Sequence, residues 1–130
     1  MKKVCEFSTH RSEVLLRNFR ESISRQSRIS AKKAFREAAE SPAPRFWVSE
    51  ARATRIITSL LKGTDLTEGM YTEKRKMYCE ILKRVKEALR TDPDRAIGDI
   101  VFDVVNSPAP SSYLTWDRAA KLIYKAKRKI

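Results

Sequence analysis

One motif occurs twice in this chain and constrains its fold more than any other feature. "SPAPRFWVSEARATRII" occupies residues 41–57 and "SPAPSSYLTWDRAAKLI" occupies residues 107–123. In each copy the two prolines lack a backbone donor and bias the residues before them toward extended geometry. A helix therefore has to end at or before Ser41 and Ser107, and another helix begins a few residues later. The chain makes the same stop, turn and start in two places.

The two copies are offset by 66 residues, and the offset extends beyond the motif. "LLRNFRESI" at residues 15–23 aligns with "ILKRVKEAL" at residues 81–89, and the apolar, basic and acidic positions agree. One gapless register across such separate segments is typical of an internal duplication. We therefore predict two repeats, residues 10–62 and 76–128, joined by a linker at residues 63–75.

Each repeat is expected to contain three helices. In the first helix, Leu15, Phe19 and Ile23 recur at the spacing of one helical face. The second helix is expected over residues 30–40, with its echo over residues 94–106. The third helix follows the Ser-Pro-Ala-Pro corner, and no segment predicts a strand. The expected fold is all-α, with the two three-helix units packed as one six-helix domain of pseudo-two-fold symmetry that spans the whole chain, residues 1–130.

Hydroxyl and glycine residues mark the expected helix ends. The predicted N-caps are Ser49, Thr115, Thr72 and either Ser8 or Thr9. Gly63 is the predicted C-cap of the first repeat. An aromatic residue, Trp47 or Tyr113, stands at each corner. We expect these rings to close the small cores, and the alternative is that they are offered for base stacking.

The charge of the chain points to an anionic partner. Lys and Arg number 28 against 16 Asp and Glu, which gives a formal net charge of +12. So much like charge destabilises a small compact domain through self-repulsion. Nucleic acid is the first candidate partner, followed by an acidic protein and an anionic membrane surface.

Basic residues recur at matching positions of the two third helices. Arg52 corresponds to Arg118 and Arg55 corresponds to Lys121 at the same offset. A duplicated basic face lets one chain present two similar positive surfaces to a duplex. The candidate nucleic-acid-binding residues are Arg45, Arg52, Arg55, Arg118, Lys121, Lys125 and Arg128. The alternative is a solvated helix surface, since lysine and arginine are good helix formers.

No residues indicate catalysis, a metal or a cofactor. The chain has three glycines, no phosphate-binding loop and no nucleophile motif. Its two cysteines, Cys5 and Cys79, and its lone histidine, His10, lack the spacing of zinc ligands. We expect His10 to lie in a frayed N-terminal segment. The sequence therefore predicts a protein that is not an enzyme, with no cofactor and no metal.

The sequence also predicts where the protein resides. The N-terminal segment is basic but lacks the apolar region of a signal peptide. The longest apolar stretch, "IGDIVFDVV", is interrupted by Asp99 and Asp103, so no membrane span is expected. We expect a cytoplasmic protein with reduced thiols.

Two segments carry a resemblance. "SPAPRFWVSEARA" and "SPAPSSYLTWDRAAKLIYKAKR" are similar to segments of small basic proteins of gut Bacteroides genomes and their mobile elements or phages. The resemblance covers both corners and both third helices. It implies a source and a setting, and it carries over no catalytic or binding residue.

The expected function is nucleic-acid binding of an accessory or regulatory kind, with DNA favoured over RNA. Arginines and lysines of the third helices are expected to contact phosphates. The alternative is a protein–protein interaction or virion-associated structural module, in which the positive face docks an acidic protein and has no nucleic-acid role. The sequence predicts no oligomeric state.

Overall fold

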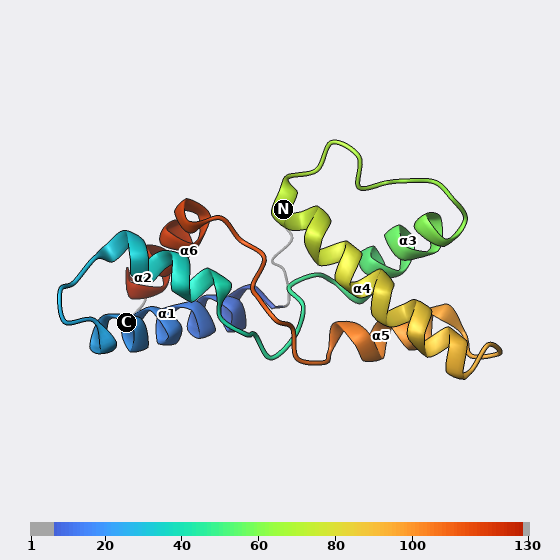
Figure 1. Cartoon of the computed structure of the whole chain (residues 1–130), viewed down its shortest axis with the longest axis horizontal. Helices are drawn as coiled ribbons and strands as arrows, with labels where there is room; N and C mark the ends of the chain where they lie inside the picture. Colours follow the sequence, from blue (N-terminus) through green and yellow to red (C-terminus); the bar gives the residue numbers. More distant parts are fainter. Residues whose placement is uncertain (1–6, 129–130) are drawn as a thin grey trace. The chain divides into compact units, whose positions relative to one another are not determined.

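The computed structural model describes residues 7–128, and within them the chain is all-α (Figure 1). Cys5 and the charged residues at the two ends of the chain lie outside this range. The described part has no strand, only an isolated bridge between Ala43 and Ala109. Six helices follow one another: α1 (Ser8–Arg25), α2 (Ala31–Glu40), α3 (Glu50–Leu61), α4 (Thr72–Thr91), α5 (Ile97–Val105) and α6 (Trp116–Arg128). The predicted all-α class is thereby confirmed.

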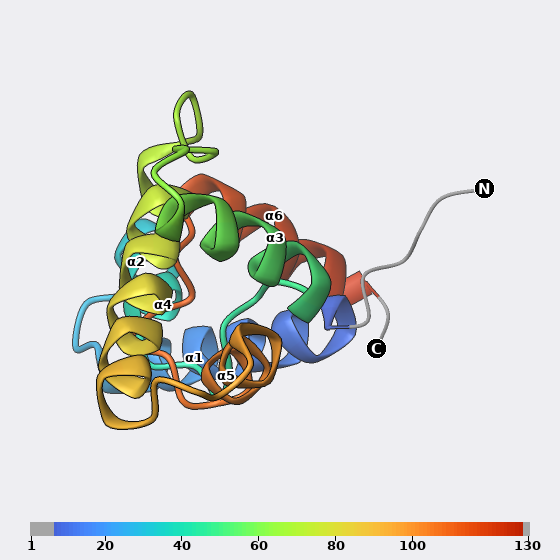
Figure 2. The same cartoon turned by 90° about the vertical axis from the view of Figure 1, so that its right-hand side faces the viewer.

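The helices form two compact units, and each unit takes helices from both predicted repeats. Unit 1 contains the chain up to Ala43 and from Ala109 onward, so it holds α1, α2 and α6. Unit 2 is the continuous segment Pro44–Pro108 and holds α3, α4 and α5, which lie around a common centre (Figure 2). The third helix of each predicted repeat thus packs on the first two helices of the other repeat, a pairing that the sequence did not predict.

The Ser-Pro-Ala-Pro copies explain this pairing. At the end of α2 the backbone of Ser41 is extended, and the prolines that follow cannot continue the helix. Beyond the corner, α3 packs on α4 and α5. Within unit 1, the N–H of Ala43 donates to the carbonyl of Ala109 at 2.9 Å, and the N–H of Ala109 donates to the carbonyl of Ala43 at 2.8 Å. Both alanines are buried. The two copies of the motif therefore pair with each other.

A second set of backbone hydrogen bonds follows each corner. In unit 2 the N–H of Phe46 donates to the carbonyl of Val105, and in unit 1 the N–H of Ser112 donates to the carbonyl of Ala39, both at 2.9 Å. The two donors are 66 residues apart, and so are the two acceptors. Each corner is therefore fixed to the end of a second helix by the same kind of bond.

Unit 1 has a core of aromatic, aliphatic and small side chains. Phe19 of α1 stacks on Phe35 of α2, with ring centroids 4.8 Å apart. Alanines let the three helices approach one another closely. The buried cluster consists of Leu15, Leu16, Phe19, Ala34, Phe35, Ala38, Ala39, Ala119, Ala120, Leu122 and Ile123.

Unit 2 buries a more aliphatic set. Its fully buried large side chains are Phe46, Ile56, Ile57, Tyr78, Ile81, Val85, Ile100, Val101 and Val105. Arg84 of α4 closes the corner of this unit. Its guanidinium lies 5.0 Å from the centre of the Phe46 ring and donates to the carbonyl of Pro108 at 2.8 Å. One cation therefore fastens the second Ser-Pro-Ala-Pro copy to the core of unit 2.

The predicted caps have mixed outcomes. The Ser49 hydroxyl accepts from the N–H of Arg52 at 3.2 Å, and the Thr115 hydroxyl accepts from the N–H of Arg118 at 3.4 Å, so both caps are confirmed. The caps at Ser8 or Thr9 and at Thr72 are wrong. Those residues already lie inside α1 and α4, whose N-cap positions are Phe7 and Tyr71 without a side-chain cap.

Gly63 ends α3 as predicted. Its φ of +94° is the left-handed conformation that glycine adopts without strain. The N–H of Gly63 donates to the carbonyl of Leu60 at 3.1 Å, and the N–H of Thr64 donates to the carbonyl of Ser59 at 2.9 Å. These two bonds are those of a Schellman motif.

Three further predictions, for the corner rings, for His10 and for the second helix of the second repeat, have different outcomes. Trp47 is 7% exposed, so its predicted place in the core is confirmed, whereas Tyr113 is only half-buried at a φ of +54°. The predicted frayed segment around His10 is wrong, because that residue lies within α1. The second helix of the second repeat is shorter than expected, since the N–H of Arg95 donates to the carbonyl of Asp92 in a turn before α5.

Candidate nucleic-acid interface

The seven predicted basic residues fall into both units. Arg118, Lys121, Lys125 and Arg128 lie on α6 in unit 1, whereas Arg45, Arg52 and Arg55 lie in unit 2. The predicted residues therefore belong to two separate surfaces, one on each unit.

In unit 1 a cleft of about 210 Å³ lies between the start of α1 and α6. Arg118, Lys121 and Lys125 line it from α6, where their spacing of three and four residues places them on one side of the helix. Three hydroxyl residues of α1 line the opposite wall. The full lining is Ser8, Thr9, Arg11, Ser12, Arg118, Lys121, Leu122, Lys125 and Ala126. We call this the α1–α6 cleft, and no carboxylate is among the lining residues that the structure describes.

The first turn of α1 adds to the positive potential of the cleft. The N–H groups at the start of a helix lack partners within the helix, and the macrodipole makes that end attractive to anions. The first turn of α1 contains no acidic residue, and Phe7 at the N-cap position provides no side-chain cap. Hydroxyls of α1 and cations of α6 therefore line one cleft beside the start of a helix, which is the chemistry that binds phosphate.

One carboxylate lies beside the cleft. The Thr115 hydroxyl, by its hydrogen bond to the carboxylate, lowers the pKa of Asp117, and the charge of Lys121 lowers it further. Asp117 is therefore ionised at neutral pH and offsets part of the charge of Lys121. Arg118 and Lys125 have no ion-pair partner within the described residues.

The positive charge of another surface of α1 is balanced more completely by neighbouring carboxylates. Arg17 and Arg20 line a shallow depression on the exposed side of α1 together with Glu13 and Glu21. Two carboxylates beside two guanidinium groups leave little net charge to attract a phosphate. The α1–α6 cleft is therefore the stronger candidate in unit 1.

In unit 2 two of the three predicted basic residues, Arg45 and Arg52, are hydrogen-bonded within the protein. The Nε of Arg52 donates to the Oη of Tyr78 at 3.4 Å, and Tyr78 is 1% exposed. Arg45 donates from Nε to the carbonyl of Phe46 at 2.9 Å and from Nη2 to the carbonyl of Val48 at 2.7 Å. Arg55 is exposed. The guanidinium of Arg45 thus stabilises the corner. Of the three residues, only Arg55 is exposed without a side-chain hydrogen bond to another group of the described protein.

A second surface of unit 1, which the sequence did not reveal, lies on the side of α6 that faces α2. Trp116 is 40% exposed and Tyr124 is 50% exposed. The Nζ of Lys32 lies 5.0 Å from the centre of the Trp116 ring, and the Nζ of Lys127 lies 5.8 Å from that of Tyr124. We call Lys32, Trp116, Tyr124 and Lys127 the aromatic–basic patch.

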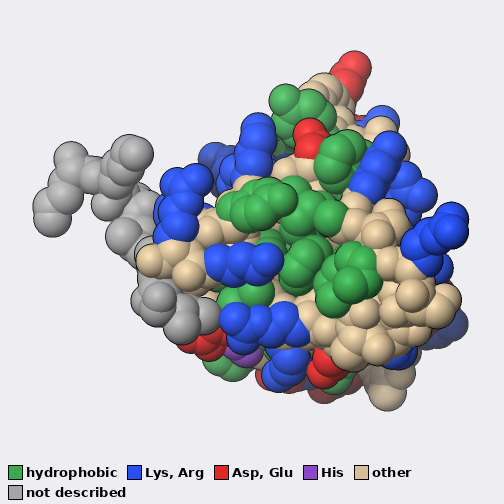
Figure 3. Space-filling view, turned by 90° about the vertical axis from the view of Figure 1, so that its left-hand side faces the viewer, with side chains coloured by type: hydrophobic (Ala, Val, Ile, Leu, Met, Phe, Trp, Pro, Cys, Tyr) green, Lys and Arg blue, Asp and Glu red, His purple; other side chains and the backbone are tan. Residues whose placement is uncertain are grey.

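Apolar and basic side chains also lie together on one face of the protein. In Figure 3 hydrophobic side chains form a continuous area, and lysine and arginine side chains lie around it. A signal for the patch is present in the sequence, since Trp116, Ala120, Tyr124 and Lys127 recur at one helical face. An aromatic residue at such spacing is usually core, so the exposure became evident only from the packing.

Comparison with protein-family models, with curated proteins and with solved structures finds no match to this chain. Within residues 7–128 no three histidine, cysteine or acidic residues cluster as metal ligands would. In the same range, no helix has the length and apolar character needed to cross a bilayer. The one cysteine in this part of the chain, Cys79, is an exposed thiol.

Proposed function

We propose that this chain is a small basic nucleic-acid-binding protein that contacts phosphates through the α1–α6 cleft. The observation that carries the proposal is the composition of that cleft. Arg118, Lys121 and Lys125 line it opposite hydroxyl residues at the start of α1, and none of its described lining residues is a carboxylate. We infer that DNA is bound in preference to RNA and that the role is accessory or regulatory.

The charge of the whole chain supports this assignment. A net charge of +12 attracts a polyanion over long distances and raises the rate of encounter. Arginine and lysine supply charge-assisted hydrogen bonds to phosphate oxygens, and hydroxyls and backbone N–H groups complete them. Binding of this kind positions the protein on the backbone and does not depend on sequence.

We also propose that the two repeats, residues 10–62 and 76–128, arose by tandem duplication. In this proposal the repeats exchange their third helices and are related by a pseudo-two-fold axis. The matched hydrogen bonds from Phe46 and Ser112 support this proposal, as does the reciprocal pair between Ala43 and Ala109. Duplication explains why both repeats have the same corner, and the prolines of that corner favour exchange.

The test is fluorescence anisotropy of labelled duplex DNA and single-stranded RNA across a salt series. The variant R118Q/K121Q/K125Q should bind duplex DNA more weakly. The slope of log affinity against log salt should become shallower by up to about 0.9 for each phosphate that the variant no longer neutralises. The charge-matched control is K74Q/K83Q/K86Q, which removes three exposed lysines of α4 outside the cleft. Equal weakening in both variants would show that only net charge matters and would contradict the assignment of the cleft.

A second candidate function is supported by a specific observation. The exposed rings of Trp116 and Tyr124 belong to the kind of apolar surface that an adaptor uses to dock a protein. In that case the positive face receives an acidic protein and nucleic acid has no role. Absence of nucleic-acid binding at physiological salt, together with capture of an acidic protein, would favour this candidate.

A further inference from the structure

We propose that the aromatic–basic patch of unit 1 stacks unpaired bases, so that single-stranded nucleic acid is the preferred ligand of this unit. The proposal deepens the proposed function and rests on it. It assigns the phosphates to the cations of unit 1 and the bases to the rings of Trp116 and Tyr124.

The ring of Tyr124 is held in place by the core. It meets Phe35 edge-on, with ring centroids 5.5 Å apart and an interplanar angle of 62°. Phe35 is itself stacked on Phe19 at 4.8 Å, and both phenylalanines are buried. A row of three rings therefore leads from the core to the surface. A ring anchored in this way loses little conformational entropy when a base stacks on it.

Trp116 provides a second ring on the same side of α6. It is the first residue of the helix, eight residues before Tyr124, which corresponds to about 12 Å along the axis. Ala120 lies between them and contributes only a methyl group. The two rings are therefore separate stacking points along one line, as a single strand requires.

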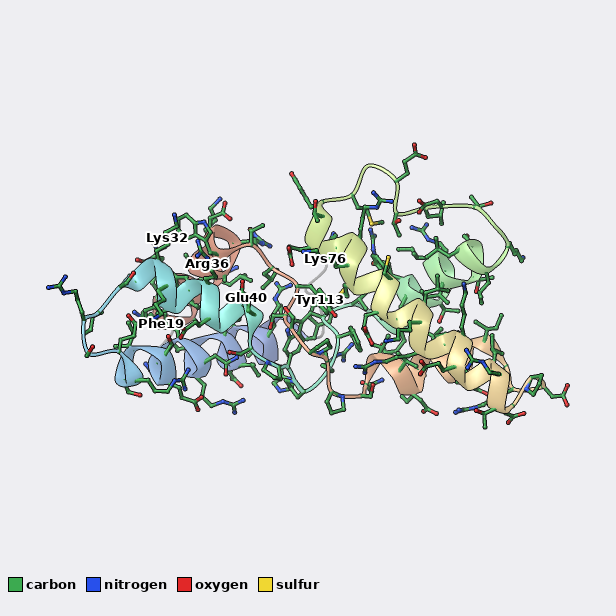
Figure 4. The ribbon with its side chains drawn as sticks, in the orientation of Figure 1. Phe19, Lys32, Arg36, Glu40, Lys76 and Tyr113 are labelled. Atoms are coloured by element: carbon green, nitrogen blue, oxygen red, sulfur yellow. The ribbon has the colours of Figure 1, made fainter. Side chains whose placement is uncertain are left out.

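Cations flank the rings from both helices. Lys127 of α6 lies near the ring of Tyr124, and Lys32 of α2 lies near the ring of Trp116. Arg36 and Glu40 continue the row of Lys32 along α2 (Figure 4). An acidic peptide matches the cations but offers no flat π surface for the two rings. An unpaired strand offers regularly spaced negative charges and one π face for each base, so it matches both features.

Unit 2 indicates that the rings are not needed to build such a unit. At the offset of 66 residues, Trp116 corresponds to Glu50 and Tyr124 corresponds to Thr58. Lys32 and Lys127 correspond to Gly98 and Leu61. Unit 2 packs three helices with none of the four patch residues at these positions. A role in binding therefore explains the presence of Trp116 and Tyr124 better than a requirement of the fold does.

The test measures tryptophan fluorescence and anisotropy of the full chain with an oligo(dT) strand and with a duplex. Trp47 is buried, so quenching on binding of oligo(dT) reports Trp116, and the variant Trp116→Leu should lose it. Trp116→Leu and Tyr124→Leu should each bind oligo(dT) about 5- to 30-fold more weakly and bind the duplex unchanged. The matched control is Tyr71→Leu, because Tyr71 is 84% exposed and lies outside the patch.

The outcomes separate the two proposals. If both leucine variants bind oligo(dT) like the unaltered protein while R118Q/K121Q/K125Q binds weakly, the stacking proposal is overturned and the cleft assignment stands. If neither oligo(dT) nor duplex binds at physiological salt, the proposed function fails and stacking fails with it. Quenching by poly-glutamate but not by oligo(dT) would overturn the proposal in favour of an acidic protein partner. Circular dichroism melting of each variant identifies any weakening that results from unfolding.

Discussion

The two units share one plan of three helices but present different surfaces between the first and third helices. In unit 1 the α1–α6 cleft is open, and Ser12 lines it. At the offset of 66 residues Ser12 corresponds to Tyr78, which is fully buried in unit 2 and accepts a hydrogen bond from Arg52. Arg52 in turn corresponds to Arg118 of the cleft. The position that lines the open cleft in unit 1 is therefore occupied by a buried ring in unit 2.

Under the proposed function, this difference separates a structural unit from a binding unit. Repeats that arise by duplication begin with the same surface, and only one of them needs to retain or gain a site. In unit 2 the counterparts of Ser12, Trp116 and Tyr124 are Tyr78, Glu50 and Thr58, whereas the cleft cations Arg118 and Lys121 have Arg52 and Arg55 as counterparts. We therefore expect substitutions in unit 2 to change stability and substitutions at the cleft to change binding.

The largest effect is expected from removing the ring that fills unit 2. Tyr78→Ala should lower the free energy of unfolding by about 3–5 kcal/mol, because a buried aromatic side chain leaves a cavity when it is removed. Ser12→Ala, at the matched position of unit 1, should change it by less than about 0.5 kcal/mol. Urea denaturation followed by circular dichroism measures both. Similar destabilisation in the two variants would contradict the proposed difference between the units.

A reciprocal change should close the cleft. Ser12→Tyr brings the side chain of unit 2 into unit 1, where it is expected to occupy the space beside Arg118. Duplex binding should weaken by roughly tenfold, as expected when one phosphate is no longer bound. Anisotropy measures this weakening, and Ser12→Ala serves as the control that keeps the cleft open. Undiminished binding by a folded Ser12→Tyr protein would exclude the cleft as the phosphate site.

Smaller effects are expected from the two confirmed N-caps, which occupy matched positions. Ser49→Ala and Thr115→Ala should each cost about 1 kcal/mol of stability, since each hydroxyl satisfies a first-turn N–H group. Only Thr115→Ala should also weaken binding, because α6 carries the cleft and α3 does not. Denaturation and anisotropy on the same samples separate the two effects. Equal changes in affinity would show that both units bind.

The sequence predicts the helices, because local signals in the chain mark where they begin and end. The prolines after Ser41 and Ser107 and the apolar spacing in each helix indicated all six helices. The pairing of helices was not predictable, because both third helices have the same apolar pattern and either one satisfies either pair of partners. A pattern indicates which face of a helix is buried but not which helix covers it.

Of the candidate site, only the basic residues could be predicted from the sequence. Arg118, Lys121 and Lys125 were found from the excess of basic residues and the repeat. The sequence did not show that Arg45 would be bound to backbone carbonyls or that Arg52 would meet Tyr78. The exposure of Trp116 and Tyr124 also depends on how α6 packs against α2. These features are tertiary, and no local pattern encodes them.

The smallest expected effect concerns a carboxylate that only unit 2 has at its matched position. The backbone N–H of Glu50 and the side-chain amide of Asn106 lower the pKa of the Glu50 carboxyl below its ordinary value of 4.5. Asn106 Nδ2 donates to Glu50 Oε1 at 3.1 Å. Because the pKa is lower in the folded state, the ionised form stabilises the fold. That contribution is present above the unfolded pKa and is lost as the pH falls through the folded pKa.

Acid titration of stability therefore tests this carboxylate. Between about pH 6 and pH 3 the free energy of unfolding should decrease less in Glu50→Gln than in the unaltered protein. Urea midpoints at several pH values measure the difference. Unit 1 has Trp116 at the matched position, which does not titrate, so Trp116→Leu should leave the pH dependence unchanged. If Glu50→Gln has the same acid dependence as the unaltered protein, the hydrogen bond from Asn106 contributes nothing to the stability of unit 2.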